Sequence, residues 1–228
     1  MGPTTPFDRA PAVESSASVS SADETPATVE ARLMWDQRYG GKEYAYGTEP
    51  NEFLVAMSPR LPMGRVLCLG EGEGRNAVWL ASQDHDVTAV DASRVGLEKA
   101  QRLAAERGVT ITTVHSDLAE YDIDSDTWDG IVSVFCHLPP KLRADLHRCC
   151  VAGLRSGGLM LLEAYTPRQL GHGTGGPPVA ELMMDEETLR AELAGLEFLH
   201  LQECEREIHE GAFHNGLAAV VQMVGRKP

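Results

Sequence analysis

A run of alternating glycines, Gly70-Glu71-Gly72-Glu73-Gly74, constrains the fold of this 228-residue chain more than any other feature. It follows a short apolar segment, 65–69, and precedes a segment, 76–82, that we expect to be helical. Glycines permit a tight turn and allow a ligand to come close to the backbone. The run therefore predicts a strand–loop–helix unit with a ligand-binding loop, since a plain strand-to-helix turn does not need three of them.

Strand-like and helix-like segments alternate along most of the chain. Short apolar runs predict strands, and the Ala-, Leu- and charge-rich segments between them predict helices. This alternation is typical of a Rossmann-like, doubly wound α/β fold with a mostly parallel sheet. The expected strands are 65–69, 86–90, 110–115, 128–135 and 159–164, and the expected helices are 76–82, 95–107, 141–154 and 185–193.

Both ends of the chain depart from this alternation. Residues 198–208 and 213–224 look like strands, and 209–212 suits a hairpin turn between them. Because a hairpin joins antiparallel strands, we expect one antiparallel strand at the end of the sheet. Residues 1–30 are rich in Ser, Thr, Ala and Pro, which predicts a disordered tail followed by a single domain over 31–228.

The glycine loop by itself fits two kinds of ligand. Its three glycines match the G-x-G-x-G of methyltransferases that use S-adenosylmethionine, while the last two with Ala77 match the G-x-G-x-x-G/A of dinucleotide enzymes. A pyrophosphate at a helix N-terminus is disfavoured by acidic neighbours such as Glu71 and Glu73. A sulfonium compound with an ammonium group tolerates them, so the loop favours S-adenosylmethionine.

Two acidic residues follow the next two strands. Asp91 could accept hydrogen bonds from both hydroxyls of a ribose, or it could cap the following helix, a task for which Ser93 is equally placed. Asp117 stands where an adenine amino group could be met, or it caps a turn.

These segments resemble class I S-adenosylmethionine-dependent methyltransferases, and more closely a small bacterial family related to the tellurite-resistance methyltransferases. The resemblance runs from about residue 34 to the end of the chain. It is carried by WDQRY at 35–39, YGTEPN at 46–51, the loop at 70–76 and GTGGP at 173–177.

The resemblance implies the strand order 3-2-1-4-5-7-6 with strand 7 antiparallel. It also implies cofactor-binding roles for Gly70, Gly72, Asp91 and Asp117. With their neighbours, the expected cofactor site is Gly70, Glu71, Gly72, Glu73, Gly74, Asn76, Asp91, Ala92, Asp117, Leu118 and Phe135.

One position departs from the family pattern. Methyltransferases of this class often carry an acidic residue two positions before the first loop glycine, and here that residue is Cys68. We expect Glu71 to take over the contact with the ammonium group of the cofactor.

The acceptor is expected at the carboxyl ends of the fourth and fifth strands, where ligands bind in such sheets. His137 and Tyr165 lie there and suit acceptor contact or proton transfer, or they simply pack at strand ends. Arg206, in the hairpin, could bind an anionic acceptor, or form an exposed ion pair with a neighbouring glutamate. We take these three residues as the catalytic candidates.

A second glycine-rich segment, 171–178, is either a flexible surface linker or, as the resemblance implies, a cover over the active site. Aromatic residues near the N-terminus could close the pocket from the other side, although aromatics also simply pack. The expected acceptor-binding residues are Trp35, Tyr39, Tyr46, Thr174, Gly175 and His214.

The composition limits the partners. A net charge of −14 without a basic run argues against a nucleic-acid partner, and no apolar stretch approaches the roughly 20 residues of a membrane helix. The five cysteines show no metal-ligand spacing, and His209, Glu210 and His214 are irregularly spaced, so no metal is expected. We expect a cytoplasmic monomer or homodimer.

The sequence therefore predicts an enzyme that transfers a methyl group from S-adenosylmethionine to a small-molecule acceptor, leaving S-adenosylhomocysteine. A thiol or a chalcogen anion would need little base catalysis, whereas an amine or hydroxyl would need a base, for which His137 is the first candidate. A non-catalytic protein that binds S-adenosylmethionine or S-adenosylhomocysteine is one alternative. A nicotinamide-dependent oxidoreductase is another, disfavoured by the loop carboxylates and the lack of a substrate domain.

Overall fold

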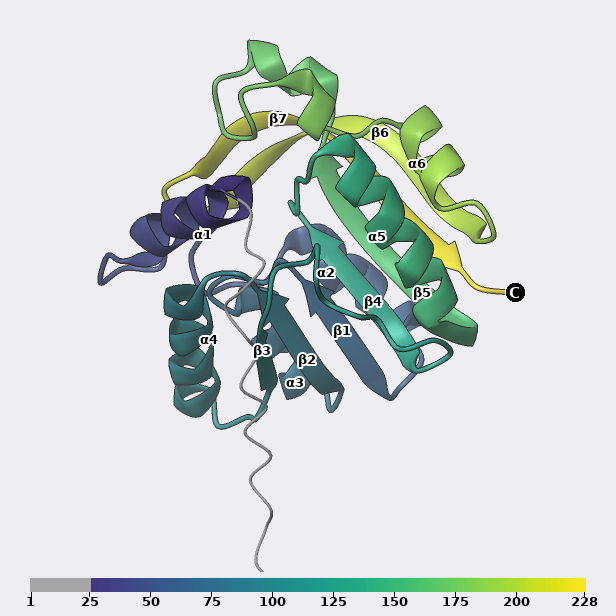
Figure 1. Ribbon diagram of the computed structural model, residues 1–228, viewed down its shortest axis with the longest axis horizontal. Helices are drawn as coiled ribbons and strands as arrows, with labels where there is room; N and C mark the ends of the chain where they lie inside the picture. The colour runs from purple at the N-terminus through teal and green to yellow at the C-terminus, as the bar shows by residue number, and fades with distance from the viewer. Residues whose placement is uncertain (1–25) are drawn as a thin grey trace, which may run out of the picture.

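The computed structural model describes residues 26–228 (Figure 1). Its first helix, α1 (Pro26–Tyr39), begins inside the segment 1–30 that we expected to be a disordered tail. The rest of that predicted tail, residues 1–25, lies outside the described residues. Within 26–228, no helix is both long enough and apolar enough to cross a membrane.

In the part of the chain described, a seven-stranded sheet has the order β3-β2-β1-β4-β5-β7-β6. β7 runs antiparallel to both β5 and β6, while β1 pairs in parallel with β2 and β4. The predicted strand order and the antiparallel strand are confirmed. The strands are β1 (Arg65–Leu69), β2 (Asp86–Asp91), β3 (Thr112–His115), β4 (Trp128–Val134), β5 (Leu154–Tyr165), β6 (Glu197–Glu210) and β7 (His214–Arg226).

The helices begin where the sequence supplies a capping side chain or a proline. Asn51, Ser93 and Asp185 each accept a hydrogen bond from a backbone N–H in the first turn of the helix that follows. Besides α1, the α-helices are α2 (Glu52–Met57), α3 (Arg75–Ser82), α4 (Arg94–Glu106), α5 (Pro140–Gly153) and α6 (Glu186–Glu192).

The sheet is buried on both faces because its strands alternate apolar side chains between two cores. In β1, Val66 and Cys68 pack with residues of α3 and α4, whereas Leu67 and Leu69 pack with residues of α5 and α6. Figure 1 shows α5 lying across one face of β4 and β5. This two-sided packing explains why the central strands read as continuous apolar runs.

The strand boundaries differ most from the prediction at the start of β5 and at the hairpin turn. β5 begins at Leu154 rather than residue 159, because Leu154 pairs with Trp128 before a register shift, and Gly157, with φ +82°, lies within the strand. In the hairpin, Glu210 pairs with His214, so His209 and Glu210 belong to β6 rather than to the turn. The turn end of this hairpin reaches the segment after α1, where the Ala212 N–H donates to the Ala45 carbonyl (3.0 Å).

Candidate active site

The glycine loop between β1 and α3 adopts a backbone conformation that favours glycine. Gly70, Gly72 and Gly74 have φ of +59°, +61° and +90°. A Cβ atom added at Gly72 would lie 2.5 Å from the hydroxyl oxygen of Tyr39, so the ring of that α1 residue packs directly on the loop. The left-handed backbone and the close neighbour together explain why glycine is needed here.

Glu71 caps helix α3 from within this loop. Its Oε1 accepts hydrogen bonds from the N–H groups of Asn76 (2.9 Å) and Ala77 (2.8 Å), because the N-cap residue, Gly74, has no side chain. Burial nevertheless raises the pKa of the Glu71 carboxyl to about 7. The second oxygen, Oε2, is not used by these bonds. Cys68, at the position where relatives often carry an acid, is fully buried in the core.

Glu73 and Asn76 anchor the loop to its neighbours. The buried Glu73 carboxylate forms an ion pair with Lys99 of α4 (2.6 Å) and accepts the Ala45 N–H (2.7 Å). Asn76 Oδ1 accepts the N–H of Asn51 (2.9 Å). Both side chains, which we expected to contact the cofactor, are therefore engaged by protein groups.

Asp91 lies buried at the end of β2, beside the loop. Its Oδ2 accepts the Gly72 N–H (2.8 Å) and its Oδ1 accepts the Ser93 N–H (2.7 Å), while burial raises its pKa. The Ser93 hydroxyl, not Asp91, caps α4 by accepting the Gly96 N–H (3.1 Å). A carboxylate accepts about four hydrogen bonds, so Asp91 keeps capacity for a ligand.

The ends of β2 and β3 bring Ala92, Asp117 and Leu118 to the same edge. His115 Nε2 lies 2.9 Å from the carbonyl oxygen of Ala92. Asp117 Oδ1 accepts the Ala119 N–H (2.8 Å), which is the turn-capping role we had left open, and its other oxygen is not used by that bond. Leu118 is buried against the core.

These groups fit S-adenosylmethionine. The buried Asp91 carboxylate suits the two hydroxyls of a ribose, and the second oxygen of Glu71 suits an ammonium group. Gly70 and Gly72 place no side chain between these two carboxylates. Asp117 stands at the neighbouring strand end, on the side expected for adenine.

Aromatic rings from segments far apart in the sequence meet at the carboxyl ends of β4 and β5. Phe135, directly after β4, has φ of +53°, a strained backbone of a kind that clusters at functional sites. We use the name ring series for the rings of Trp35, Tyr39, Tyr46, His214, Phe135, Tyr165 and His137. Its successive ring-centroid contacts are Trp35–Tyr39 (5.5 Å), Tyr39–Tyr46 (6.3 Å), Tyr46–His214 (4.5 Å), His214–Phe135 (4.7 Å), Phe135–Tyr165 (4.6 Å) and Tyr165–His137 (5.7 Å).

Within the ring series, His137 is tied to the backbone at both nitrogens. Its Nδ1 lies 3.0 Å from the Leu182 carbonyl oxygen, and its Nε2 accepts the Tyr165 N–H (3.4 Å). Burial lowers the pKa of His137 to about 4. The buried Tyr165 hydroxyl, in contrast, has no hydrogen-bond partner among residues 26–228. Both nitrogens of His137 are therefore occupied by backbone groups, whereas the Tyr165 hydroxyl has no partner within the described residues.

Arg206 is engaged in a buried ionic network rather than facing an open site. Its guanidinium binds Glu163 through Nε and Nη2 (2.8 and 2.7 Å) and reaches Glu210 (3.4 Å). Asn51 Nδ2 joins the same two carboxylates (2.6 and 2.9 Å). The ion pair considered for Arg206 exists, but with buried Glu163 instead of its exposed sequence neighbours. The prediction missed Glu163, Asn51 and Glu210.

The segment 171–178 covers part of the ring series. A Cβ atom at Gly175 would lie 2.8 Å from the Tyr165 hydroxyl oxygen and 3.2 Å from the His214 ring. Thr174 donates from its hydroxyl to the Leu217 carbonyl (2.6 Å) and accepts from buried Gln169 Nε2 (3.0 Å). Thr174 therefore fastens the segment to β7, while Gly175 lies over the rings.

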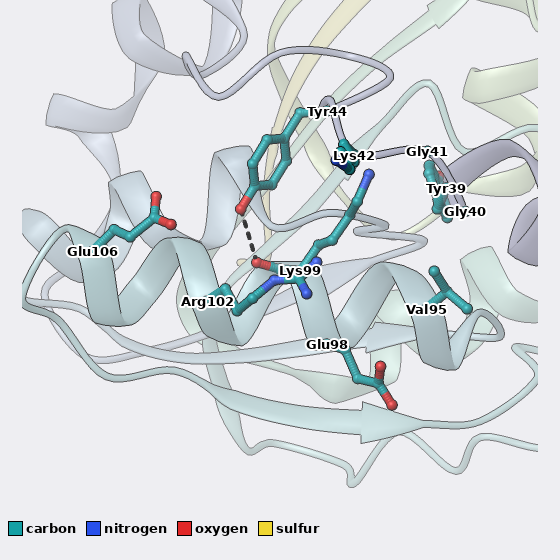
Figure 2. Close-up of a pocket in the computed structure, with 10 residues that line it drawn as sticks. All are labelled: Tyr39, Gly40, Gly41, Lys42, Tyr44, Val95, Glu98, Lys99, Arg102 and Glu106. Atoms are coloured by element: carbon teal, nitrogen blue, oxygen red, sulfur yellow. Dashed lines mark hydrogen bonds between the residues drawn. The ribbon is translucent and has the colours of Figure 1, made fainter.

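A pocket of about 420 Å³ lies between the residues after α1 and the outer side of α4 (Figure 2). The Tyr44 hydroxyl donates to the Lys99 carbonyl there (3.3 Å). The Lys99 ammonium is already held by Glu73 and by the Glu43 carbonyl (2.7 Å). Since the loop and strand ends do not line this pocket, we do not assign the cofactor to it.

Sequence comparison identifies a methyltransferase domain over residues 66–158. The chain is 25% identical over 162 residues to 2-heptyl-1-hydroxyquinolin-4(1H)-one methyltransferase of Mycobacteroides abscessus, covering 69% of this chain and 67% of the relative. It is 26% identical over 170 residues to thiopurine S-methyltransferase of Aliivibrio fischeri, covering 67% and 76%.

Solved structures show the same fold. TehB from Haemophilus influenzae aligns with a TM-score of 0.64 at 21% identity, covering 86% of this chain and 67% of that one. The N-methyltransferase NodS from Bradyrhizobium japonicum, in complex with S-adenosylhomocysteine, aligns with a TM-score of 0.63 at 15% identity, covering 86% and 98%. The strand order 3-2-1-4-5-7-6, the glycine loop after β1 and the methyltransferase domain matched over residues 66–158 agree with one another, and together they support a class I S-adenosylmethionine-dependent methyltransferase.

Proposed function

We propose that this protein methylates a small, planar heteroaromatic acceptor at a thiol or hydroxyl group. The ring series is the observation that carries the proposal. Partly buried Phe135 and Tyr46, backed by buried Tyr165 and His214, form an aromatic wall at the strand ends. Flat rings stack favourably on such a wall, which contributes about 0.5–1.5 kcal/mol per ring pair beyond area burial.

Two of the curated relatives support this acceptor class. Their names give a hydroxyquinolone and a thiopurine as the acceptors, and both are flat heterocycles. A thiol and a hydroxyl were both among the acceptors considered from the sequence, together with a chalcogen anion and an amine. We further propose that the enzyme has no nucleic-acid partner, on the ground of its net charge of −14.

The roles of the chain follow from this assignment. S-adenosylmethionine supplies an electrophilic methyl group on a sulfonium. Asp91 and Glu71 orient that cofactor, and the ring series holds the acceptor in line with the methyl group. Correct alignment of two reactants is worth roughly 7–11 kcal/mol of the barrier. The segment 171–178 and the turn end of the β6–β7 hairpin exclude water from above.

The first test combines calorimetry with an acceptor panel. We expect micromolar binding of S-adenosylhomocysteine and no binding of NAD. Heteroaromatic thiols and hydroxyls should then be methylated with higher kcat/KM than aliphatic amines, selenite or tellurite. Tyr46→Leu should raise the KM for the aromatic acceptor about tenfold, because one ring of the wall is lost, without changing S-adenosylhomocysteine affinity. Faster methylation of tellurite or selenite than of any aromatic acceptor would refute the proposal.

Glu71 makes cofactor affinity depend on pH. Its carboxyl, with a pKa raised to about 7 by burial, must be ionised to pair with the cofactor ammonium. The affinity for S-adenosylhomocysteine should therefore increase as the pH rises from 6 to 8. Glu71→Gln should weaken binding about tenfold at pH 8 and abolish the pH dependence. Calorimetric titrations at several pH values measure both effects.

The control for this experiment is thermal unfolding. Glutamine retains an oxygen for the N–H groups of Asn76 and Ala77, so Tm of Glu71→Gln should change little. Glu71→Ala removes the cap as well and should cost about 1 kcal/mol of unfolding free energy. Equal affinity and equal pH dependence in wild type and Glu71→Gln would show that the ammonium is bound elsewhere.

A further inference from the structure

His214 and Glu210 form a carboxylate–imidazole pair beside the ring series. Glu210 ends β6 and His214 begins β7, so the two residues face each other across the hairpin turn. His214 Nδ1 lies 3.7 Å from Glu210 Oε2, an ion-pair distance that must shorten slightly to make a hydrogen bond. The ring of His214 packs between Tyr46, Phe135 and Tyr165, with centroids at 4.5, 4.7 and 5.4 Å.

Glu210 is held in its ionised form. Its Oε2 accepts from Arg75 Nη2 of the cofactor-loop helix (2.6 Å), and its Oε1 accepts from Asn51 Nδ2 (2.9 Å). Burial alone would raise the pKa of Glu210, but the contacts with His214 and Arg75 outweigh burial and hold it at about 2. A permanent negative charge at Nδ1 orients the imidazole and stabilises its protonated form, as in other carboxylate–histidine pairs.

Of the two histidines in the ring series, only His214 has a nitrogen free for an acceptor. His137 uses both nitrogens on backbone groups, Leu182 and Tyr165. In His214, the buried Nδ1 lies 3.7 Å from Glu210 Oε2 and makes no hydrogen bond within residues 26–228, and Nε2 is likewise not hydrogen-bonded to any of these residues. A general base must have a lone pair within reach of the proton it removes, so the geometry favours His214 over our first candidate, His137.

We propose that His214 Nε2 is the general base of the methyl transfer and that Glu210 is its positioning residue. The proposal rests on the proposed function and deepens it. The S–H or O–H bond of the acceptor breaks, its proton moves to Nε2, and the electron pair stays on the acceptor sulfur or oxygen. The imidazolium is stabilised by Glu210 and later releases its proton to solvent.

The pair also predicts which acceptors the enzyme favours. A weakly acidic hydroxyl or thiol stays protonated at neutral pH and needs the base. An acidic heteroaromatic thiol is already ionised and does not. The charged or titratable groups that surround His214, and that would also influence the pH dependence of the reaction, are Glu210, Arg75, Arg38, Tyr46, Tyr165 and His137.

The kinetic test compares these two acceptor types in His214→Gln. With a weakly acidic hydroxyl acceptor, kcat should fall about 100-fold, the lower end of the usual range for general-base catalysis. With an acidic thiol, kcat should fall much less than with the hydroxyl, while the KM for both acceptors should rise because one ring of the wall is lost. The affinity for S-adenosylhomocysteine should be unchanged. Equal losses for both acceptors, or no loss with the hydroxyl, would overturn the proposal. If wild type methylates no aromatic acceptor at all, the proposed function fails instead.

A second test needs no turnover. The imidazole of His214 is titrated by NMR in wild type, Glu210→Gln and Glu207→Gln. Burial lowers the pKa of His214 and the Glu210 carboxylate opposes that effect, so Glu210→Gln should lower the pKa further. Glu207 is exposed on the same strand, and its variant serves as the matched control with no expected shift. An unchanged titration in Glu210→Gln would show that the two side chains are not coupled.

Discussion

Replacing Glu163 with alanine should lower the unfolding free energy by about 3–5 kcal/mol, the usual cost of removing one partner of a buried ion pair. Glu163 is fully buried in β5, and its carboxylate accepts four hydrogen bonds. Two come from Arg206, one from Asn51 Nδ2 and one from Gln222 Nε2 (2.7 Å). Alanine would leave these donors unpaired in the interior, and the Arg206 charge would lose its principal partner.

Urea unfolding measures this loss. The control is the double variant Glu163→Met with Arg206→Met, which removes both charges and should recover part of the stability, because a buried ion pair is often replaceable by apolar groups of similar size. If Glu163→Ala were as stable as wild type, or if the double variant were less stable than the single one, the network would not stabilise the fold in the way described. Asn51 lies just before α2, and Gln222 lies in β7. The loss of their hydrogen bonds to Glu163 should therefore also loosen the start of α2 against β7.

The fold follows from the sequence where each strand lies between two helices. β1 is the clearest example. Its alternate side chains enter two separate cores, and a short, wholly apolar run is the only pattern that satisfies both. The turn residues were harder. The sequence does not show that Gly157 lies within β5, because that depends on the pairing of Leu154 with Trp128. Nor does it show that His209 and Glu210 continue β6, because that depends on the length of the hairpin turn.

The candidate site was predictable at its backbone positions and less so at its side chains. Gly70 and Gly72 lie where a left-handed backbone is required, and Asp91 is at the end of β2. Glu73 was different. Lys99 is 26 residues away, and no pattern in the sequence around Glu73 indicates that the two side chains meet inside the protein. A carboxylate beside a loop glycine is interpreted as a ligand contact as long as its partner inside the protein is not known.

Glu163 carried a signal that we did not use. It is a lone acid inside the apolar run 159–164, and such a residue must find partners inside the protein. The sequence cannot say which residues those are. Arg206 and Gln222 reach Glu163 only because β7 inserts antiparallel between β5 and β6, which brings the hairpin under the strand ends. The same insertion brings His214 to Phe135.

Gly74→Ala should be among the most damaging single-methyl changes in the chain. At φ +90° an L-residue is strained, which costs roughly 1–2 kcal/mol. The added Cβ would also lie 2.5 Å from the Cβ and 2.7 Å from the Cα of Ala100 in α4, and backbone cannot yield as a flexible side chain does. Overpacking of this kind costs about 1–3 kcal/mol more. We expect a total loss of about 2–5 kcal/mol and weaker S-adenosylhomocysteine binding, since α3 and α4 would be forced apart at the loop.

Gly108→Ala separates the two causes. Gly108 also has a left-handed backbone (φ +70°), but a Cβ there would meet nothing within 4 Å. Its variant should show the backbone term alone, about 1–2 kcal/mol, with unchanged affinity for S-adenosylhomocysteine. Urea unfolding and calorimetry of both variants give the comparison. If the two glycines cost the same, the contact between Gly74 and Ala100 is not limiting. If Gly74→Ala costs more and also weakens the cofactor, then the packing of the loop against α4 is what sets the geometry of the cofactor site.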